Sequence, residues 1–169
     1  LSPPIRTPRV PSQCARLSQG MDGPLLPGSS LPVTWRMPEV DIPSGARIEE
    51  MIGLAFGGVD SYDFHALEVI QCMAERRRGG ETGVAWVQGL RGEAFWKAMQ
   101  AGSWEKGGWS PELFEACLCR SQQLVQPRAT FSHWHPTPAE IRQNVKEPIA
   151  YRYLHRDGTR ATMFLMNGL

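Results

Sequence analysis

The sequence lacks the features of several large protein classes. Its 169 residues carry a formal net charge of only +1, so the charge balance does not favour nucleic acid or an anionic membrane as a partner. No apolar run approaches the roughly 20 residues that cross a bilayer, and no apolar segment follows the early arginines as it does in a secretory signal. We therefore expect a cytoplasmic protein that binds neither nucleic acid nor a membrane.

Cysteine is scarce and poorly placed for a structural role. The four cysteines form no CxxC pair and no plausible disulfide framework. Two of them are separated by one residue on a predicted helix, so their side chains diverge. We expect reduced thiols, as is usual in a cytoplasmic protein, at Cys14, Cys72, Cys117 and Cys119.

Several catalytic motifs are also missing. The sequence contains no G-x-S-x-G, no H-E-x-x-H and no dinucleotide-binding G-x-G-x-x-G. The glycine-rich segment 79–83 lacks the lysine of a phosphate-binding loop, and no helix is expected directly after it, which favours a turn. The sequence therefore lacks the motifs that would indicate a serine hydrolase or a self-sufficient dehydrogenase.

Proline divides the chain into two parts. Nine of the 14 prolines precede residue 44, and residues 1–20 carry three arginines, no acidic residue and no hydrophobic periodicity. Such a segment buries too little surface to offset the entropy of ordering. A transit peptide would need an amphipathic helix, which these prolines oppose. We expect 1–27 to be a disordered or non-native extension and 28–169 to be one incomplete α+β domain.

Hydrophobic periodicity and capping residues predict the elements of that domain. Two signals stand out: the Thr137–Glu140 capping box with its proline in the first turn, and the Asp157-Gly158 pair between two β-rich runs, which indicates a hairpin. The predicted order is an edge strand over 31–36, a strand over 47–56, a helix capped by Asp60 or Ser61 and ending near Arg77, a buried strand over 84–90, helices over 92–101, 110–124 and 137–147, and hairpin strands over 149–154 and 159–165. This order predicts an α+β fold with a partial open sheet and helices on one face.

The segment 56–68 is the strongest candidate for a functional site. It predicts a strand end, a glycine turn and a helix start, where side chains project from a rigid support. His65 and Glu68 are three residues apart on one side of the helix, so His65 can transfer a proton while Glu68 orients the ring. Tyr62, Asp63 and Asp60 are candidates for substrate binding, although a capped helix whose histidine bonds to a backbone carbonyl fits the same residues.

Two further groups are weaker candidates. Trp35 and Arg36 can face a binding site, but they fit ordinary packing equally well. His133 and His135 form a His-x-His pair, a spacing that can supply two metal ligands. A metal-dependent isomerase or hydrolase using these histidines, with His65 as a third ligand, is therefore a third hypothesis, and the Arg76–Arg78 run is interpreted as a complement to the helix dipole.

From about Gly28 to the C-terminus the chain resembles a planctomycete-type group of bacterial proteins with no assigned reaction. The matching segments are GSSLPVTWR, GGVDSYDFHALE, QCMAERRRGGETGV and EPIAYRY…DGTRATMFLMNG. More remotely, it is similar to the C-terminal domain of the glucose–fructose oxidoreductase and inositol dehydrogenase-like family. Gly57-Gly58 matches the family's turn, His65 its histidine and Glu68 its acid, whereas Ser61 stands where the family has an aspartate.

This resemblance implies a two-domain, Rossmann-type oxidoreductase that uses NAD or NADP on a sugar, polyol or related hydroxy compound. It implies that His65 is the acid/base and Glu68 its orienting partner. The family's nucleotide-binding glycines have no match in 1–27, so we expect this chain alone neither to bind the dinucleotide well nor to turn over. The alternative is a non-catalytic module for sugar binding or for homo-oligomerisation through the open sheet, which the Ser61 departure favours.

Overall fold

The computed structural model describes residues 20, 28–36, 39, 41–119 and 135–169. They form an α+β fold with one four-stranded mixed sheet and four α-helices. The order is η1 (Leu31–Val33, a 3₁₀ helix), β1 (Glu50–Ala55), α2 (Asp63–Ala74), β2 (Val84–Arg91), α3 (Glu93–Ala101), α4 (Pro111–Leu118), α5 (Pro138–Asn144), β3 (Ile149–His155) and β4 (Arg160–Leu165). The predicted extension over 1–27 lies almost wholly outside the described residues.

The sheet has the strand order β1-β4-β3-β2. The C-terminal hairpin forms its centre, since β3 and β4 pair antiparallel and are both almost fully buried. Strand β1 pairs parallel with β4, from Glu50 opposite Arg160 to Ala55 opposite Leu165, and β2 pairs antiparallel with β3. Strands β1 and β2 are thus the two edges within the described sheet.

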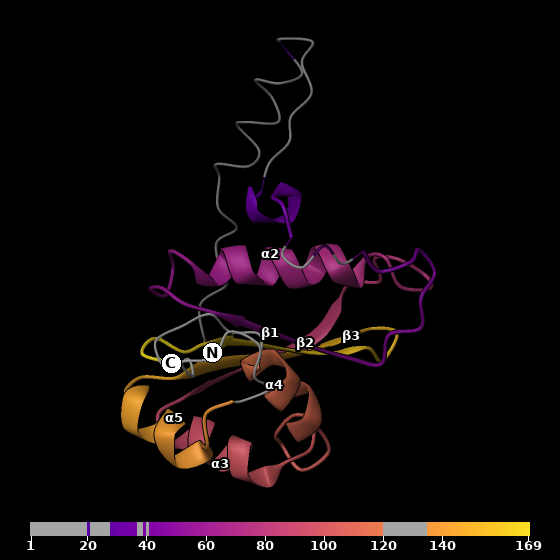
Figure 1. Cartoon of the computed structure of the whole chain (residues 1–169). Coiled ribbons are helices and arrows are strands. Elements are labelled where there is room, and N and C mark those ends of the chain that lie inside the picture. The colour runs from indigo at the N-terminus through magenta and orange to yellow at the C-terminus, as the bar shows by residue number, and fades with distance from the viewer. Residues whose placement is uncertain (1–19, 21–27, 37–38, 40, 120–134) are drawn as a thin grey trace, which may run out of the picture.

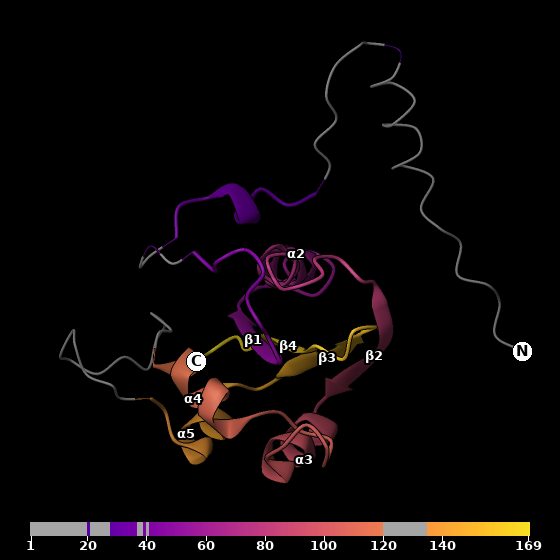
Figure 2. The same ribbon diagram turned by 90° about the vertical axis from the view of Figure 1, so that its right-hand side faces the viewer.

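Helices cover both faces of the sheet, so the prediction of helices on one face is wrong. Figure 1 shows α2 on one side and α3, α4 and α5 on the other, and Figure 2 shows the same layers from the end. Side chains explain this arrangement, because the hairpin strands are apolar on both faces. Met163 and Leu165 pack toward Ala66 and Ile70 of α2, while Phe164 packs into the other layer.

The three-helix layer has an aromatic core. The ring centroid of Phe164 lies 4.7 Å from that of Trp109, 5.0 Å from Phe114 and 6.1 Å from Phe95, and all four side chains are at most 5% exposed. Large rings with edge-to-face contacts account for much of the stabilisation that burial provides. This layer therefore makes a firm support for the central hairpin.

The predicted start signals in this layer are confirmed. Ser110 accepts a hydrogen bond from Leu113 N at 3.2 Å, with Pro111 in the first turn of α4. Thr137 and Glu140 form the reciprocal capping box of α5. The predicted 92–101 helix and the hairpin are also present. Helix α4 ends at Leu118 with Cys119 as its C-cap, before the predicted end near residue 124, which lies outside the described residues.

Two predicted strands differ in the structure. Residues 31–36 are not an edge strand, because Leu31–Val33 forms a 3₁₀ turn with Pro32 at its start. Strand β2 is present but it is not buried: apart from Leu90 its residues are exposed. The reason is its place at the sheet edge, which an apolar run in the sequence does not reveal. None of the described helices is long and apolar enough to cross a membrane.

Both ends of α2 differ from the prediction. Its N-cap is Tyr62, which makes no side-chain capping bond, so neither Asp60 nor Ser61 caps the helix. Asp60 instead adopts a left-handed φ of 64° in the preceding turn. The helix ends at Ala74 rather than near Arg77. Arg77 nevertheless donates to Ala74 O at 2.7 Å, so this arginine complements the C-terminal end of the helix as predicted.

Candidate functional site

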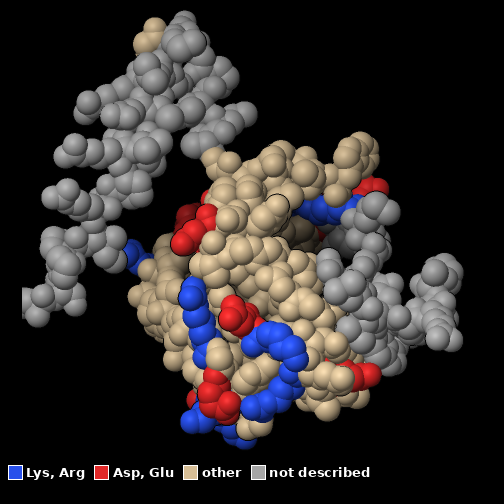
Figure 3. Space-filling view, turned by 90° about the vertical axis from the view of Figure 1, so that its left-hand side faces the viewer, with Lys and Arg blue, Asp and Glu red and all other residues tan. Residues whose placement is uncertain are grey.

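The candidate site lies where β1 ends and α2 begins. The amide of Gly57 donates to Asn167 Oδ1 at 2.6 Å, and Asn167 Nδ2 donates back to Gly57 O at 2.9 Å, so the turn is tied to the end of β4. Gly57 has a φ of 119°, and a Cβ there would lie 2.4 Å from the Tyr62 ring. Only glycine meets both conditions without strain. Figure 3 shows this end of the molecule, with charged groups of both signs gathered below a largely uncharged region.

His65 is the central side chain of the site. It is part-buried, and its Nδ1 lies 2.6 Å from Ser29 Oγ, 36 residues away in sequence. Ser29 Oγ also accepts a hydrogen bond from Leu31 N at 3.1 Å, so the turn before η1 fixes the hydroxyl. Among the described residues the second ring nitrogen of His65, Nε2, has no hydrogen-bond partner. One nitrogen is thus held by the protein while the other is available.

The hydrogen bond to Ser29 sets what Nε2 can do. If Nδ1 keeps its proton and donates to Ser29 Oγ, Nε2 has a lone pair and can accept a proton from a bound hydroxyl. If the hydroxyl donates to Nδ1, Nε2 carries a hydrogen and can donate to a bound oxygen. Either state makes His65 a directional polar contact for a hydroxylated ligand.

Two aromatic rings flank His65. The ring centroid of Phe64 lies 4.0 Å from that of His65 and the ring of Tyr62 lies 6.1 Å away. Both side chains are about half exposed, at 45% for Phe64 and 55% for Tyr62. Sugar rings present apolar C–H faces, and exposed aromatic rings beside a polar group bind such faces. Tyr62 therefore remains a candidate for substrate binding.

Asp63 is buried at the start of α2 and has structural partners. Its Oδ1 accepts from Phe64 N at 2.9 Å, and its Oδ2 accepts from the Tyr151 hydroxyl at 3.1 Å. Burial, together with the Asp63 carboxylate, raises the pKa of the Tyr151 hydroxyl, so that hydroxyl stays protonated and donates. Asp63 thus anchors α2 to β3 beside His65.

Glu68 and Asp60 lie near the site without contacting the His65 ring in any hydrogen bond or ion pair of the described chain. Glu68 is exposed, and its carboxylate lies against the backbone of Gly28, where a Cβ would be 3.3 Å from Oε2. Ser29, not Glu68, holds Nδ1. Asp60 is exposed in the turn before α2.

Trp35 and Arg36 lie elsewhere. Trp35 is 95% exposed. Arg36 pairs with Asp41 at 3.3 Å and reaches Cys72 Sγ at 3.9 Å, in the second half of α2. Both line a shallow pocket of about 450 Å³ with Arg76. The structure therefore does not bring these two residues to His65.

The predicted histidine pair is described only in part. His133 lies outside the described residues, and His135 sits beside α5 with its Nε2 3.9 Å from Glu115. No group of three or more histidines, cysteines or carboxylates that could hold a metal occurs within the described ranges. His65 is on α2, which lies on the opposite side of the sheet from α5 (Figure 1). His65 and His135 are therefore not brought together as ligands of one metal ion in the described part of the chain.

Sequence reasoning missed Ser29 and Tyr151. Ser29 is 36 residues from its partner, and Tyr151 is 88 residues from Asp63, so no local spacing could reveal either pair. The only available signal was the matching segment that contains Ser29-Ser30.

The turn between β1 and α2 does not fit a dinucleotide. A pyrophosphate would need free amides at the start of the helix, but the Phe64 amide is taken by the side chain of Asp63, a residue that is 9% exposed. The Gly57 amide is taken by Asn167. A buried carboxylate at this position repels phosphate. The described residues therefore provide no NAD or NADP cradle here.

Comparisons with protein-family models, with curated proteins and with solved structures found no match.

Proposed function

We propose that this domain binds a small, uncharged, polyhydroxylated compound at the N-terminal end of α2, with His65 as the group that transfers a proton to or from a substrate hydroxyl. One observation carries the proposal: His65 Nδ1 is held by Ser29 Oγ at 2.6 Å while Nε2 has no partner in the described chain. A histidine fixed in this way is typical of an acid/base group.

The surroundings of His65 support an uncharged ligand. Two half-exposed rings, Phe64 and Tyr62, provide an apolar surface beside the polar nitrogen. Two acids of α2 have contacts of their own: Asp63 is buried and bonded to Tyr151, and the Glu68 carboxylate lies against Gly28. Because both carboxylates have contacts within the protein, neither is an obvious partner for a charged group on the ligand.

Only the sequence resemblance supports an oxidoreductase role for this domain. The turn at Gly57 offers no dinucleotide cradle, so the proposal contains no hydride-transfer step. We expect this polypeptide to show no tight NADH or NADPH binding in a fluorescence titration, and a saturable enhancement at micromolar NADH would contradict that expectation.

The second candidate is a non-catalytic association module. Strand β2 is a sheet edge with exposed apolar side chains, of which Val87 is 63% and Trp86 is 39% exposed. Edges of this kind pair with another chain. Sedimentation of the wild type and of Val87→Lys tests this, because an association through β2 should be lost in the variant.

The main test is equilibrium binding of a panel of neutral aldoses, ketoses and cyclitols, measured by ligand-observed NMR. At least one compound should bind the wild type saturably, and His65→Gln should weaken that binding at least tenfold. His135→Gln is the matched control, since it makes the same change on the other side of the sheet. Unfolding curves must show that both variants fold.

Two outcomes would count against the proposal. One is the absence of saturable binding across the panel. The other is equal binding by the wild type and by folded His65→Gln, which would leave the association module as the better account.

A further inference from the structure

The opposite end of α2 carries a second pocket. It has a volume of about 450 Å³ and is bounded by the chain entering β1 (46–49), the turn after α2 (77–78) and the turn between β3 and β4 (157–160). This volume lies within the range of small-molecule sites. The pocket is far from His65 along α2 and does not share any of its residues.

The pocket is rich in arginine. Four arginines and two carboxylates line it: Arg47, Arg77, Arg78 and Arg160 with Glu49 and Asp157. Arg160 also pairs with two carboxylates outside the lining, Glu105 at 2.7 Å and Glu50 at 3.7 Å. Guanidinium groups are weakly hydrated and present paired N–H donors that match the oxygens of phosphate and carboxylate. The lining therefore favours an oxyanion over a cation or an apolar ligand.

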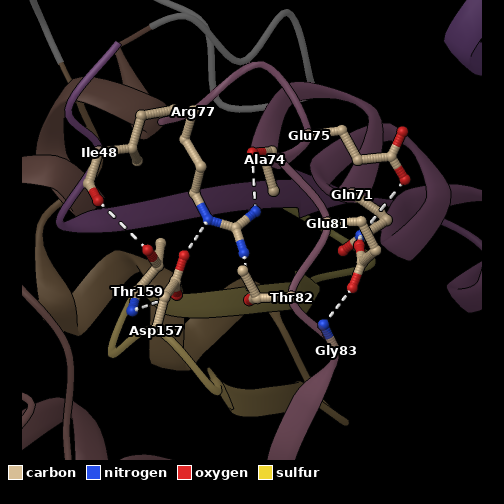
Figure 4. Close-up of polar contacts among 10 residues, drawn as sticks. All are labelled: Ile48, Gln71, Ala74, Glu75, Arg77, Glu81, Thr82, Gly83, Asp157 and Thr159. Carbon is tan, nitrogen blue, oxygen red and sulfur yellow. Dashed lines mark hydrogen bonds and ion pairs between the residues drawn. The ribbon is translucent and has the colours of Figure 1, made fainter. Parts of the chain in front are cut away.

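Arg77 gives the pocket a rigid wall. Its side chain is 2% exposed, and Figure 4 shows its guanidinium donating to Asp157, Ala74 and Thr82. The distances are 2.7 Å from Nε to Asp157 Oδ2, 2.7 Å from Nη1 to Ala74 O and 2.8 Å from Nη2 to Thr82 Oγ1. Desolvation acts to raise the pKa of Asp157, but the hydrogen bonds from Arg77 and Thr159 outweigh it and lower the pKa to about 2. Arg77 and Asp157 thus neutralise each other and do not depend on a ligand.

Backbone hydrogen bonds hold the three segments together. Arg78 N donates to Ala46 O at 2.9 Å, and Arg160 N donates to Glu49 O at 3.0 Å. Thr159 Oγ1 donates to Ile48 O at 3.3 Å. These two amides and this hydroxyl are therefore already used within the protein.

Arg78 is the donor best placed to meet a ligand. It is exposed at the pocket and its guanidinium has no ion pair or hydrogen bond among the described residues. Arg47 pairs with Glu49 at 2.8 Å, but both side chains are more than two-thirds exposed, and such pairs exchange at little cost. A dianion can therefore recruit both guanidiniums without breaking the buried pair of Arg77 with Asp157.

We propose that this pocket binds a phosphate dianion, as free phosphate or as a phosphate monoester, through Arg78 and Arg47. The space beyond one phosphate group leaves room for the organic part of a monoester. The proposal does not depend on the function assigned to His65.

The test is isothermal titration with two probes, inorganic phosphate and glycerol phosphate, at low ionic strength. Saturable binding with one site is expected, and Arg78→Gln should weaken it at least tenfold. Lys97→Gln is the control, because it removes one positive charge from an exposed position on α3, in the other layer, and should change affinity less than twofold. Tighter binding of glycerol phosphate would identify a monoester as the ligand, and equal binding would identify free phosphate.

Arg47→Gln provides a second, independent variant, because Arg47 is 83% exposed and its loss should leave the fold intact. It should also weaken binding, by at least threefold. The proposal is overturned if neither probe binds saturably, or if Arg78→Gln and Lys97→Gln weaken binding equally, since that would reflect overall charge and not a site.

Discussion

The two ends of α2 use similar residues in opposite ways. At the N-terminal end, His65 is part-buried, keeps one ring nitrogen without a partner in the described chain and lies between half-exposed rings. At the C-terminal end, Arg77 is fully buried and bonded through all three guanidinium nitrogens. Beside it, His155 is fully buried, with neither ring nitrogen bonded to another described group.

This difference separates groups that can react from groups that support the fold. A polar group bonded on every side and shielded from water stabilises its surroundings, and it can meet a ligand only at a large cost. A group held on one side and open on the other is positioned for a ligand. This contrast supports our proposals of proton transfer at His65 and of anion binding at the exposed arginines next to Arg77, whereas Arg77 itself supports the fold.

Arg77→Leu should have the largest effect on stability. It leaves the Asp157 carboxylate without its partner and removes the bonds to Ala74 O and Thr82. The free energy of unfolding should fall by about 3 kcal/mol, the lower end of the range for breaking a buried ion pair, because the Asp157 side chain keeps 27% exposure. Urea denaturation measures this loss. Arg142→Leu, which breaks the exposed pair with Glu93 at 3.3 Å, should cost less than about 1 kcal/mol. Equal losses in the two variants would contradict the claim that the buried Arg77 stabilises the fold more than the exposed Arg142.

Gly57→Ala should have the next largest effect on stability. Its φ of 119° is strained for alanine, and the new Cβ would meet the Tyr62 ring, so we expect a loss of about 2–3 kcal/mol and a displaced Tyr62. Gly79→Ala is the control, because Gly79 has a φ of 91° but open space around its Cβ position. A smaller loss in Gly79→Ala, of about 1 kcal/mol, would isolate the contact with Tyr62.

The C-terminal end should also give stability a dependence on pH. Burial, aided by Arg77, lowers the pKa of His155 below 6.5, against the opposing charges of Asp157 and Glu81. Above pH 6.5 both the folded and the unfolded protein hold this histidine neutral. Below it the unfolded state binds the proton first, so stability falls as the pH decreases toward the folded pKa, by at most about 1.4 kcal/mol per pH unit.

Chemical denaturation between pH 7.5 and 5 measures this slope. His155→Leu should flatten it, and His135→Gln should not. A separate loss is expected below about pH 3.8, as Asp157 approaches its lowered pKa of about 2 and the pair with Arg77 is lost. An unchanged slope in folded His155→Leu would show that another group titrates.

Ser29→Ala should have the smallest effect on stability and a specific effect on His65. Loss of one part-buried hydrogen bond should cost under about 1 kcal/mol. The ring of His65 should lose its hydrogen bond at Nδ1, which ¹⁵N chemical shifts of the imidazole report. Ser30→Ala, next to it, should leave those shifts unchanged, and an unchanged spectrum in Ser29→Ala would show that this hydroxyl does not position the ring.

Local signals predicted much of the fold. The hairpin at Asp157-Gly158, the Ser110 cap and the Thr137–Glu140 capping box are decided by residues a few positions apart, and the structure confirms them. The exposure of β2 and the placement of helices on both sheet faces depend on strand order, which is a tertiary property. Hydrophobicity alone does not distinguish an edge strand from a central one.

The candidate site was predictable only in its centre. The glycine turn and the helix start located His65, because both are local. Its partner Ser29 comes from a distant segment, and Tyr62 rather than Asp60 or Ser61 precedes the helix because Asp60 occupies the turn. The three neighbouring arginines after α2 also have separate environments, which their shared run concealed: Arg76 pairs with Asp41, Arg77 is buried and Arg78 lines the pocket.

The most direct test of the account is imidazole NMR of the wild-type protein with the four histidines assigned, titrated with neutral polyols and then with phosphate. A neutral polyol should shift the His65 Nε2 resonance saturably and leave His135 and His155 unchanged, while phosphate should leave His65 unchanged. If no polyol moves His65, or if phosphate moves it as strongly, the division of roles between the two ends of α2 is wrong.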